Sequence, residues 1–199
     1  DIAFPRNSEF FALANPKVEK LKEFLLHKNF RTFLKELDEE YAPNEEENLD
    51  YKIIDDPESL DQLVKHLIEA KEVSFDTETT SLRPMEAELV GIGFCVEKGK
   101  ARYVPCNGKL GRGAVVEALK PLFENPEIGF YSHNVKYDDH VLMNHGIEIA
   151  SISFDTLLGS YVLGAQQRQH SLDVLSLERF GKVKTPITDL IGKGKTEIG

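Results

Sequence analysis

The stretch from Val73 to Leu82, VSFDTETTSL, places two acidic residues at the end of a short apolar run. Because strand side chains alternate between faces, Asp76 and Glu78 are expected on one face and the apolar residues of the run on the other. Two carboxylates on one face repel each other unless a cation lies between them. Magnesium and manganese ions prefer such oxygen ligands, and pairs of these ions serve phosphoryl chemistry. The stretch therefore predicts a buried strand that carries candidate metal ligands.

The spacing of these two carboxylates is weak support when it is taken alone. The chain has 34 acidic residues among 199, and the pattern acid-x-acid arises by chance roughly five or six times in such a sequence. The context adds weight, because the pair closes an expected inner strand and is followed by small hydroxylated residues. A chance occurrence and a metal site both stay open at this point.

A second polar cluster lies in residues 129–146, GFYSHNVKYDDHVLMNHG. A strand is expected to end at Ser132 and a helix to follow directly, with Asp138 near its first turn. Asn134 and Asp138 are four residues apart, so we expect them to share a face at the carboxyl end of the strand, where α/β sheets bind ligands. For Asp139, a favourable interaction with the helix dipole is a sufficient explanation.

From residue 51 onward the chain alternates between strand and helix patterns. Strands are expected at 51–55, 73–78, 89–96, 101–105, 128–132 and 152–154. Helices are expected at 57–71, 115–123, 135–145, 156–163 and 171–180. Asp56 and Asp155 are the candidate N-caps of the first and fourth of these helices, and for Asp155 a cap is favoured over a metal ligand. The alternation predicts a mixed α/β sheet with helices on both faces.

Residues 1–40 have the spacing of two short helices, the first starting at Asn15 and Pro16. Residues 41–50 belong to an acidic, proline-containing stretch with little apolar content, which is typical of a linker. The chain starts with Asp1 rather than Met, so we expect it to be a piece of a longer protein.

The formal net charge of −10 does not by itself suggest a nucleic-acid partner, because Lys and Arg supply the nonspecific affinity for phosphates. If such a partner exists, metal ions or another part of the parent protein must supply the positive potential. No apolar run reaches the roughly 18 residues of a membrane-spanning helix, so no membrane partner is expected.

Three motifs together carry a family resemblance: FDTETTSL at 75–82, SHNVKYD at 132–138 and FDTLLGSYVLG at 154–164. They resemble the first two motifs, and the following strand–helix unit, of the proofreading 3′–5′ exonuclease domains of bacterial DNA polymerase I. The sequence IGKGK at 191–195 is similar to a loop typical of that family, which RNase D-type exonucleases lack. The match covers residues 51–199, and residues 1–40 are similar to the tail of the preceding 5′-nuclease domain.

The resemblance implies a ribonuclease-H-like (DnaQ-like exonuclease) fold with a mixed five-stranded sheet flanked by helices. It also implies that Asp76, Glu78 and Asp138 are catalytic and bind two divalent metal ions, Mg²⁺ or Mn²⁺, with Asp76 bridging both. The reaction implied is hydrolysis of the 3′-terminal DNA linkage by in-line attack of water, which releases a deoxynucleoside monophosphate.

The same resemblance assigns substrate contacts and partners. Leu82 would wedge against the terminal base, and Asn134 and Tyr137 would line the path of the single strand. The implied partners are the 3′ end of single-stranded DNA and the polymerase and 5′-nuclease domains of the same parent chain. The implied location is the bacterial cytoplasm, in association with the nucleoid.

One expected motif does not match. The family has a tyrosine followed four residues later by an aspartate, on a helix beyond the GKGK loop, and Tyr161 with Ala165 does not fit this pattern. We therefore expect the 51–199 domain to be truncated before its third motif and the chain to have weak or no activity. Full activity of this chain in a nuclease assay would contradict that expectation.

Two alternatives stay open. An RNA-trimming exonuclease of the RNase D type would share the three carboxylates but should lack IGKGK and the helical segment at 1–40. A non-catalytic spacer domain of a polymerase would usually have lost the acids of the first two motifs, which are present here as Asp76, Glu78 and Asp138.

Overall fold

The computed structural model describes residues 16–28, 30, 32–34, 36, 37, 49–182 and 184, together with residue 12. The chain divides into two units, each considered by itself: Glu45–His170, and Asp1–Asn44 together with Ser171–Gly199. Asn15, residues 41–48 of the expected linker and the loop at 191–195 lie outside the described residues.

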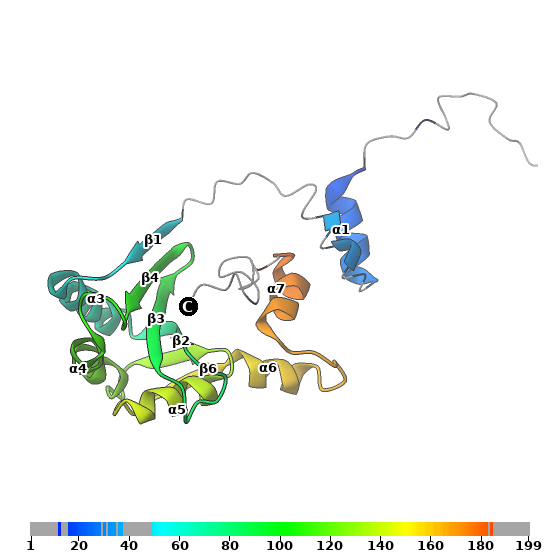
Figure 1. The fold of residues 1–199 in the computed structure, drawn as a ribbon. Helices are drawn as coiled ribbons and strands as arrows, with labels where there is room; N and C mark the ends of the chain where they lie inside the picture. Colours follow the sequence, from blue (N-terminus) through cyan, green and yellow to red (C-terminus); the bar gives the residue numbers. More distant parts are fainter. Residues whose placement is uncertain are drawn as a thin grey trace, which may run out of the picture. The chain divides into compact units, whose positions relative to one another are not determined.

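Alternating apolar residues build a six-stranded sheet in the unit Glu45–His170 (Figure 1). The strands are β1 Asp50–Ile53, β2 Glu72–Thr79, β3 Leu89–Glu97, β4 Lys100–Pro105, β5 Gly129–Ser132 and β6 Ile152–Asp155. Their order across the sheet is β1-β4-β3-β2-β5-β6. β3 pairs antiparallel with β2 and β4, and the other neighbours pair in parallel. All the expected strand segments therefore form one mixed sheet.

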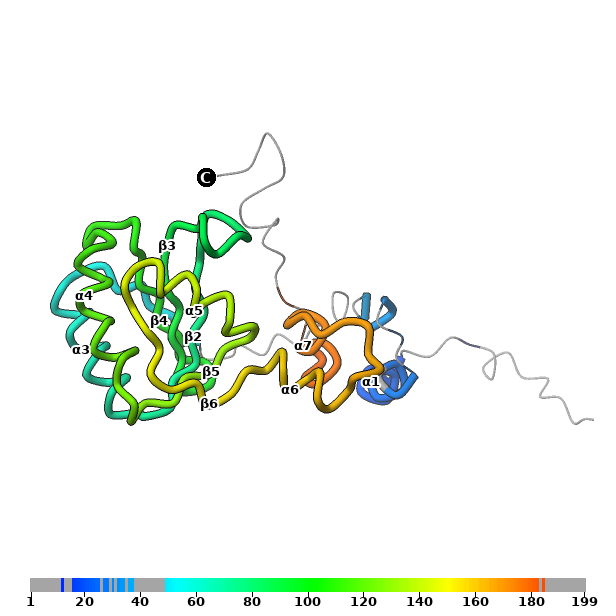
Figure 2. Tube along the Cα trace, turned by 90° about the horizontal axis from the view of Figure 1, so that it is seen from below, coloured from blue at the N-terminus to red at the C-terminus, as the bar shows by residue number. Residues whose placement is uncertain are grey.

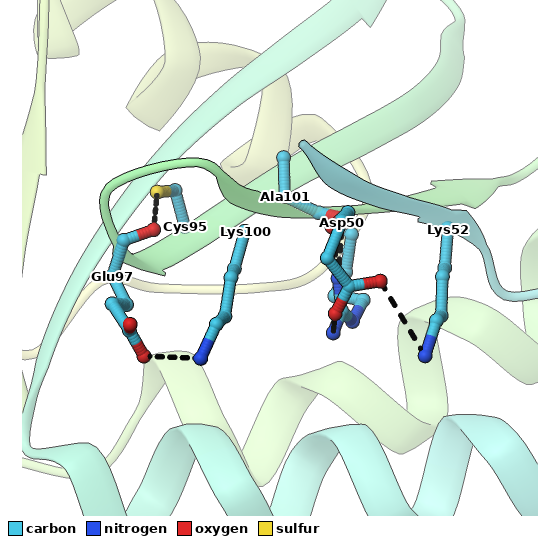
Figure 3. Close-up of polar contacts among 7 residues, drawn as sticks. Asp50, Lys52, Cys95, Glu97, Lys100 and Ala101 are labelled. Carbon is cyan, nitrogen blue, oxygen red and sulfur yellow. Dashed lines mark hydrogen bonds and ion pairs between the residues drawn. The ribbon is translucent and has the colours of Figure 1, made fainter. Parts of the chain in front are cut away.

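The expected number of five strands is corrected to six, because β1 pairs along its whole length with β4 and forms an edge of the sheet. Arg102 holds the start of β1 by donating hydrogen bonds to the Asp50 carbonyl and, at 2.6 Å, to the Asp50 carboxylate. The bond from Arg102 lowers the pKa of Asp50. Ion pairs of Asp50 with Lys52 and of Glu97 with Lys100 lie beside it (Figure 3). Main-chain pairing and side-chain charges thus both attach the sixth strand.

Four helices of this unit lie close to the expected positions. They are α3 Pro57–Ala70, α4 Arg112–Phe123, α5 Val135–Asn144 and α6 Thr156–Leu163. Asp56 caps α3 as expected, accepting a hydrogen bond of 2.9 Å from the Ser59 N–H. α4 begins at Arg112 rather than the expected Val115, because Gly111, with a φ of 74°, already forms its N-cap. α3 and α4 lie side by side (Figures 1 and 2).

Helices α3, α4 and α5 contribute to the same buried cluster as the sheet. Each connects two parallel strands, and right-handed crossovers that run in one direction place their helices on one face of a sheet. Phe75 of β2 packs edge-on against Phe123 of α4 and Phe130 of β5, with ring centroids 5.2 and 5.6 Å away. Side chains of β2 alternate strictly between exposed and buried from Glu72 to Glu78. The apolar face of β2 is therefore in the core, and the acidic face points away from it.

Glycines of β3 lie beside the acidic face of β2. In the strand register Asp76 is opposite Gly93 and Glu78 is opposite Gly91, so each pair shares a face. The Tyr103 side chain of β4 lies across Gly91, because a Cβ built on Gly91 would be 2.0 Å from the Tyr103 hydroxyl oxygen. The missing side chain at Gly91 thus gives the phenol its place next to the carboxylates.

The second unit contains α1 Val18–His27 and α7 Leu172–Phe180, where the sequence predicts helices. Leu25, Leu34 and Leu37 are buried together, and Leu177 of α7 packs against them. Within the described residues of the chain, no helix is long and apolar enough to cross a membrane.

The two glycines of β3 offer a matched test of this packing. Gly91→Ala should destabilise the domain by about 1–3 kcal/mol, because the new methyl group overlaps the Tyr103 side chain. Gly93→Ala should leave stability nearly unchanged, because its nearest atom, the Asp76 carbonyl oxygen, would lie 3.9 Å from the new Cβ. Urea denaturation of the two variants measures the difference, and equal losses would show that Tyr103 does not occupy this place.

Candidate active site

The two acids of β2 lie on one face, as the sequence predicts. Asp76 and Glu78 are both exposed, and Thr77 between them is buried on the opposite face. Carboxylates that are held by a rigid strand and open to solvent suit a hard divalent cation in type and in access. The placement of this pair therefore fits the expected metal chemistry.

Asp138 of α5 reaches the same strand from the core side. Its side chain is 3% exposed. One carboxylate oxygen accepts hydrogen bonds from the Thr77 N–H at 3.1 Å and the Thr77 hydroxyl at 2.6 Å. The other oxygen accepts a bond of 2.8 Å from the Ser132 hydroxyl at the end of β5. Asp138 thus connects α5 to two neighbouring strands.

Burial raises the pKa of Asp138, and the hydrogen bonds from Thr77 and Ser132 act against that rise. Desolvation disfavours the charged form, whereas donors that point at the carboxylate favour it. The raised pKa means that, with no cation bound, the free-energy cost of desolvating the ionised carboxylate is larger than the stabilisation from these hydrogen bonds.

The structure brings Asp138 to Thr77, the residue between the two exposed acids, but it does not assemble the predicted ligand set. Within the described residues, no group of three or more His, Cys, Asp or Glu side chains is close enough to hold a metal ion. The reason is local: Asp138 accepts from the amide and hydroxyl of Thr77, while Asp76 and Glu78 project from the other face of the strand. The metal-binding roles of the three acids stay predictions.

Asn134 does not share a helical face with Asp138, contrary to the expectation from their spacing. It is the N-cap of α5, with left-handed backbone angles of φ 69° and ψ 47°, and it is exposed. An i, i+4 argument fails there because Asn134 precedes the first helical residue. Its side chain makes no capping hydrogen bond, so the amide group is presented at the surface beside the end of β5.

Asp155 is the N-cap of α6, as predicted, accepting from the N–H groups of Leu157 and Leu158. The same carboxylate also accepts from the N–H groups of Asn134 and Val135, at 3.1 and 3.0 Å. One acid therefore holds the starts of two helices. Sequence reasoning missed this second role, because the two helix starts are far apart along the chain.

The last two predicted residues lie together around the loop that follows β2. Leu82 is 95% exposed, so its side chain is open to a ligand. The Tyr137 hydroxyl donates a hydrogen bond of 2.5 Å to the Ser81 carbonyl and lies 2.5 Å from the Thr79 hydroxyl. Tyr137 therefore contacts the main chain next to Leu82.

The sheet order and the helices on one face define the fold as ribonuclease-H-like. The solved Trypanosoma brucei RNase D in complex with GMP has this fold, with a TM-score of 0.59, 15% identity, and coverage of 69% of this chain and 44% of that one.

The chain belongs to the 3′-5′ exonuclease family, whose sequence model matches residues 51–198. DNA polymerase I of Pseudomonas aeruginosa is 38% identical over 159 residues, which cover 75% of this chain and 17% of the polymerase. DNA polymerase I of Chloroflexus aurantiacus is 36% identical over 150 residues, covering 73% of this chain and 16% of that polymerase. The predicted resemblance to the exonuclease domain of DNA polymerase I is thus confirmed, and the chain spans a small part of these relatives.

Asp138 gives a prediction with a defined pH dependence. In a metal-free buffer at pH 7, Asp138→Asn should unfold at or above the parent's midpoint, because the amide keeps the contacts to Thr77 and Ser132 without a buried charge. Asp138→Ala should lose about 1–3 kcal/mol, because buried donors are left without a partner.

The advantage of asparagine follows from the raised pKa of Asp138. A carboxyl group with a raised folded-state pKa is destabilising where it is ionised, so the advantage is complete above that pKa. It declines as the pH falls below it and vanishes below the ordinary value of 3.8. Urea midpoints measured across this range test the sign. A loss for Asp138→Asn as large as that for Asp138→Ala would show that the charge is needed for folding.

Proposed function

We propose that this chain is the 3′–5′ exonuclease domain of a DNA polymerase I, with weak or no activity by itself because its third motif does not match. Within the longer parent protein it would hydrolyse the 3′-terminal phosphodiester of single-stranded DNA and release deoxynucleoside monophosphates. The observation that carries the proposal is the exposed pair Asp76 and Glu78, held on a rigid strand, with Asp138 anchored to the residue between them. The relatedness to DNA polymerase I supports DNA as the substrate.

The proposed domain organisation follows the same relationship. Residues 51–199 would be the exonuclease domain, residues 41–50 a linker and residues 1–40 the tail of a 5′-nuclease domain. The polymerase and 5′-nuclease domains of the parent chain would be its partners, and it would act at the bacterial nucleoid in the cytoplasm.

Exonuclease domains of this family use divalent metal ions, and Asp76, Glu78 and Asp138 would hold two of them, Mg²⁺ or Mn²⁺. Bound metal of this kind supplies a water of lowered pKa and stabilises the leaving 3′ oxygen. The residues of this chain would hold the ligand carboxylates in place. Asp76 and Glu78 present oxygen ligands from one strand, and Thr77 and Ser132 fix the carboxylate of Asp138 beside that strand.

The substrate contacts are proposed for the same region, where the inner strands β2 and β5 end. Leu82 would wedge against the terminal base, because it is a large apolar side chain that is fully exposed in the loop after β2. Asn134 and Tyr137 would lie along the path of the strand. With a formal net charge of −10, the chain must meet the phosphates through metal ions and neutral groups or through other domains of the parent.

An RNase D-type exonuclease is the second candidate, since a solved RNase D shares the fold. Its identity of 15% is far below the 38% to a DNA polymerase I. Fold alone does not distinguish DNA from RNA as the substrate, so the choice between the two candidates rests on sequence relatedness and on experiment.

The test is release of monophosphates from a 3′-labelled single-stranded DNA in the presence of Mn²⁺ or Mg²⁺, with this chain and the longer parent protein assayed side by side and the substitutions made in the protein that cleaves. Asp76→Ala and Glu78→Ala should each reduce the rate by at least about 100-fold, because a lost ligand removes metal chemistry worth several kcal/mol. Glu72→Ala is the matched control, since Glu72 is an exposed acid on the same face at the other end of β2.

An RNA strand of the same sequence is assayed in parallel. Faster cleavage of DNA supports the proposed function, and faster cleavage of RNA favours the RNase D-type candidate. Equal and measurable rates for Asp76→Ala, Glu72→Ala and the unsubstituted protein would show that these carboxylates are no nuclease site.

A further inference from the structure

The loop between β2 and β3 is attached to α5 by side chains of that helix. The Tyr137 hydroxyl donates to the Ser81 carbonyl at 2.5 Å. The Thr79 hydroxyl lies 2.5 Å from the Tyr137 oxygen and 3.2 Å from the same carbonyl. The phenol can give its single proton to Ser81 and accept one from Thr79. These three groups form a closed hydrogen-bonded cluster at the point where β2 ends.

The far end of the loop is held by the far end of α5. The Asn144 amide donates to the Pro84 carbonyl at 2.8 Å. His145, the C-cap of α5, accepts at Nε2 from the Leu89 N–H at 3.4 Å. Residues 137, 144 and 145 recur at the spacing of one helical face. The loop is therefore bound along the helix at its start, middle and end.

Leu82 follows directly after the residue that Tyr137 holds. Its side chain, 95% exposed, is not fixed by packing, so the place of the side chain depends on the main chain at Ser81. A large exposed apolar group on a loop is precise only if its backbone is anchored. The Ser81 carbonyl is the anchor nearest to Leu82.

The same helix turn also carries the catalytic candidate Asp138. Tyr137 and Asp138 are consecutive, and they contact Ser81 and Thr77 respectively. Thr77 lies between the two exposed acids of β2. One turn of α5 thus sets the position of the acidic strand and of the loop with Leu82.

We infer that Tyr137 is a positioning residue, whose hydroxyl holds Leu82 at a fixed place relative to Asp76, Glu78 and Asp138. This inference rests on the proposed nuclease function, and it assigns to the hydroxyl a task within the protein rather than on the DNA. If Tyr137 has this role, the distance between Leu82 and the carboxylates is set by α5, which contacts both Ser81 and Thr77.

A first experiment tests the positioning without any nuclease assay. The chain contains no tryptophan, so Leu82→Trp creates a single fluorescent reporter at the wedge position. Adding Tyr137→Phe to this variant should increase the amplitude of nanosecond motion in time-resolved anisotropy, because the anchor of Ser81 is lost. Thr79→Val removes the other hydroxyl and should act in the same direction. Tyr51→Phe, at an exposed tyrosine of β1, is the matched control and should change nothing.

A second experiment, run in the protein form that cleaves DNA, asks whether the positioning of Leu82 by Tyr137 affects the rate of cleavage. Tyr137→Phe should lower monophosphate release about fivefold, the effect of one neutral hydrogen bond. Leu82→Ala should also lower it, and the double variant should be no slower than Leu82→Ala alone, because both changes disable the same wedge.

The possible outcomes test the positioning role of Tyr137 separately from the proposed nuclease function. Unchanged anisotropy in Tyr137→Phe overturns the positioning role, whether or not the chain cleaves DNA. A rate loss that adds fully to that of Leu82→Ala also overturns it, because Tyr137 would then act elsewhere. If neither this chain nor the longer parent protein releases monophosphate, the proposed function fails, and the anisotropy result alone decides whether Tyr137 positions the loop.

Discussion

The hydrogen bonds between Asp138 and Thr77 are the interaction on which this site depends. A carboxylate that is 3% exposed accepts from the amide and the hydroxyl of one residue on β2 and from the Ser132 hydroxyl on β5. Bonds to a charged group contribute about 1.5–3 kcal/mol each, and a buried carboxylate without them would be strongly destabilising. These hydrogen bonds join α5 to β2 and β5, and the neighbouring groups of the site are placed on the same two strands and the same helix.

This constraint explains how a core contact can serve an exposed site. β2 is buried on one face against phenylalanines and presents two acids on the other. Fixing Thr77 fixes both neighbours, because adjacent residues of a strand share one rigid main chain. Gly91 of β3 makes room for the Tyr103 side chain beside these neighbours, and Asp155 joins the starts of α5 and α6. These contacts fix the ends of β2 and β5 relative to α5 and leave the carboxylates of Asp76 and Glu78 exposed.

Local pattern was sufficient to predict much of this fold and little of its cross-connections. The alternation in VSFDTETTSL predicts both faces of β2, and the N-caps at Asp56 and Asp155 follow from residue type at a helix start. The bond between Thr77 and Asp138 spans 61 residues, so no local pattern contains it. The left-handed backbone at Asn134 invalidates a spacing argument that assumes helix geometry. The edge strand β1 is visible as a segment, but its place in the sheet comes from pairing with the distant strand β4 and from the bond to Arg102.

The central claim is that the acids of β2 hold a metal ion, and a crystal of the full chain soaked in Mn²⁺ tests it most directly. Anomalous scattering from manganese locates the ion without reference to activity. We expect a peak bound by the carboxylates of Asp76 and Glu78, and loss of that peak in crystals of Asp76→Ala but not of Glu72→Ala. A manganese peak confined to other acidic groups, or the same peak in Asp76→Ala, would contradict it.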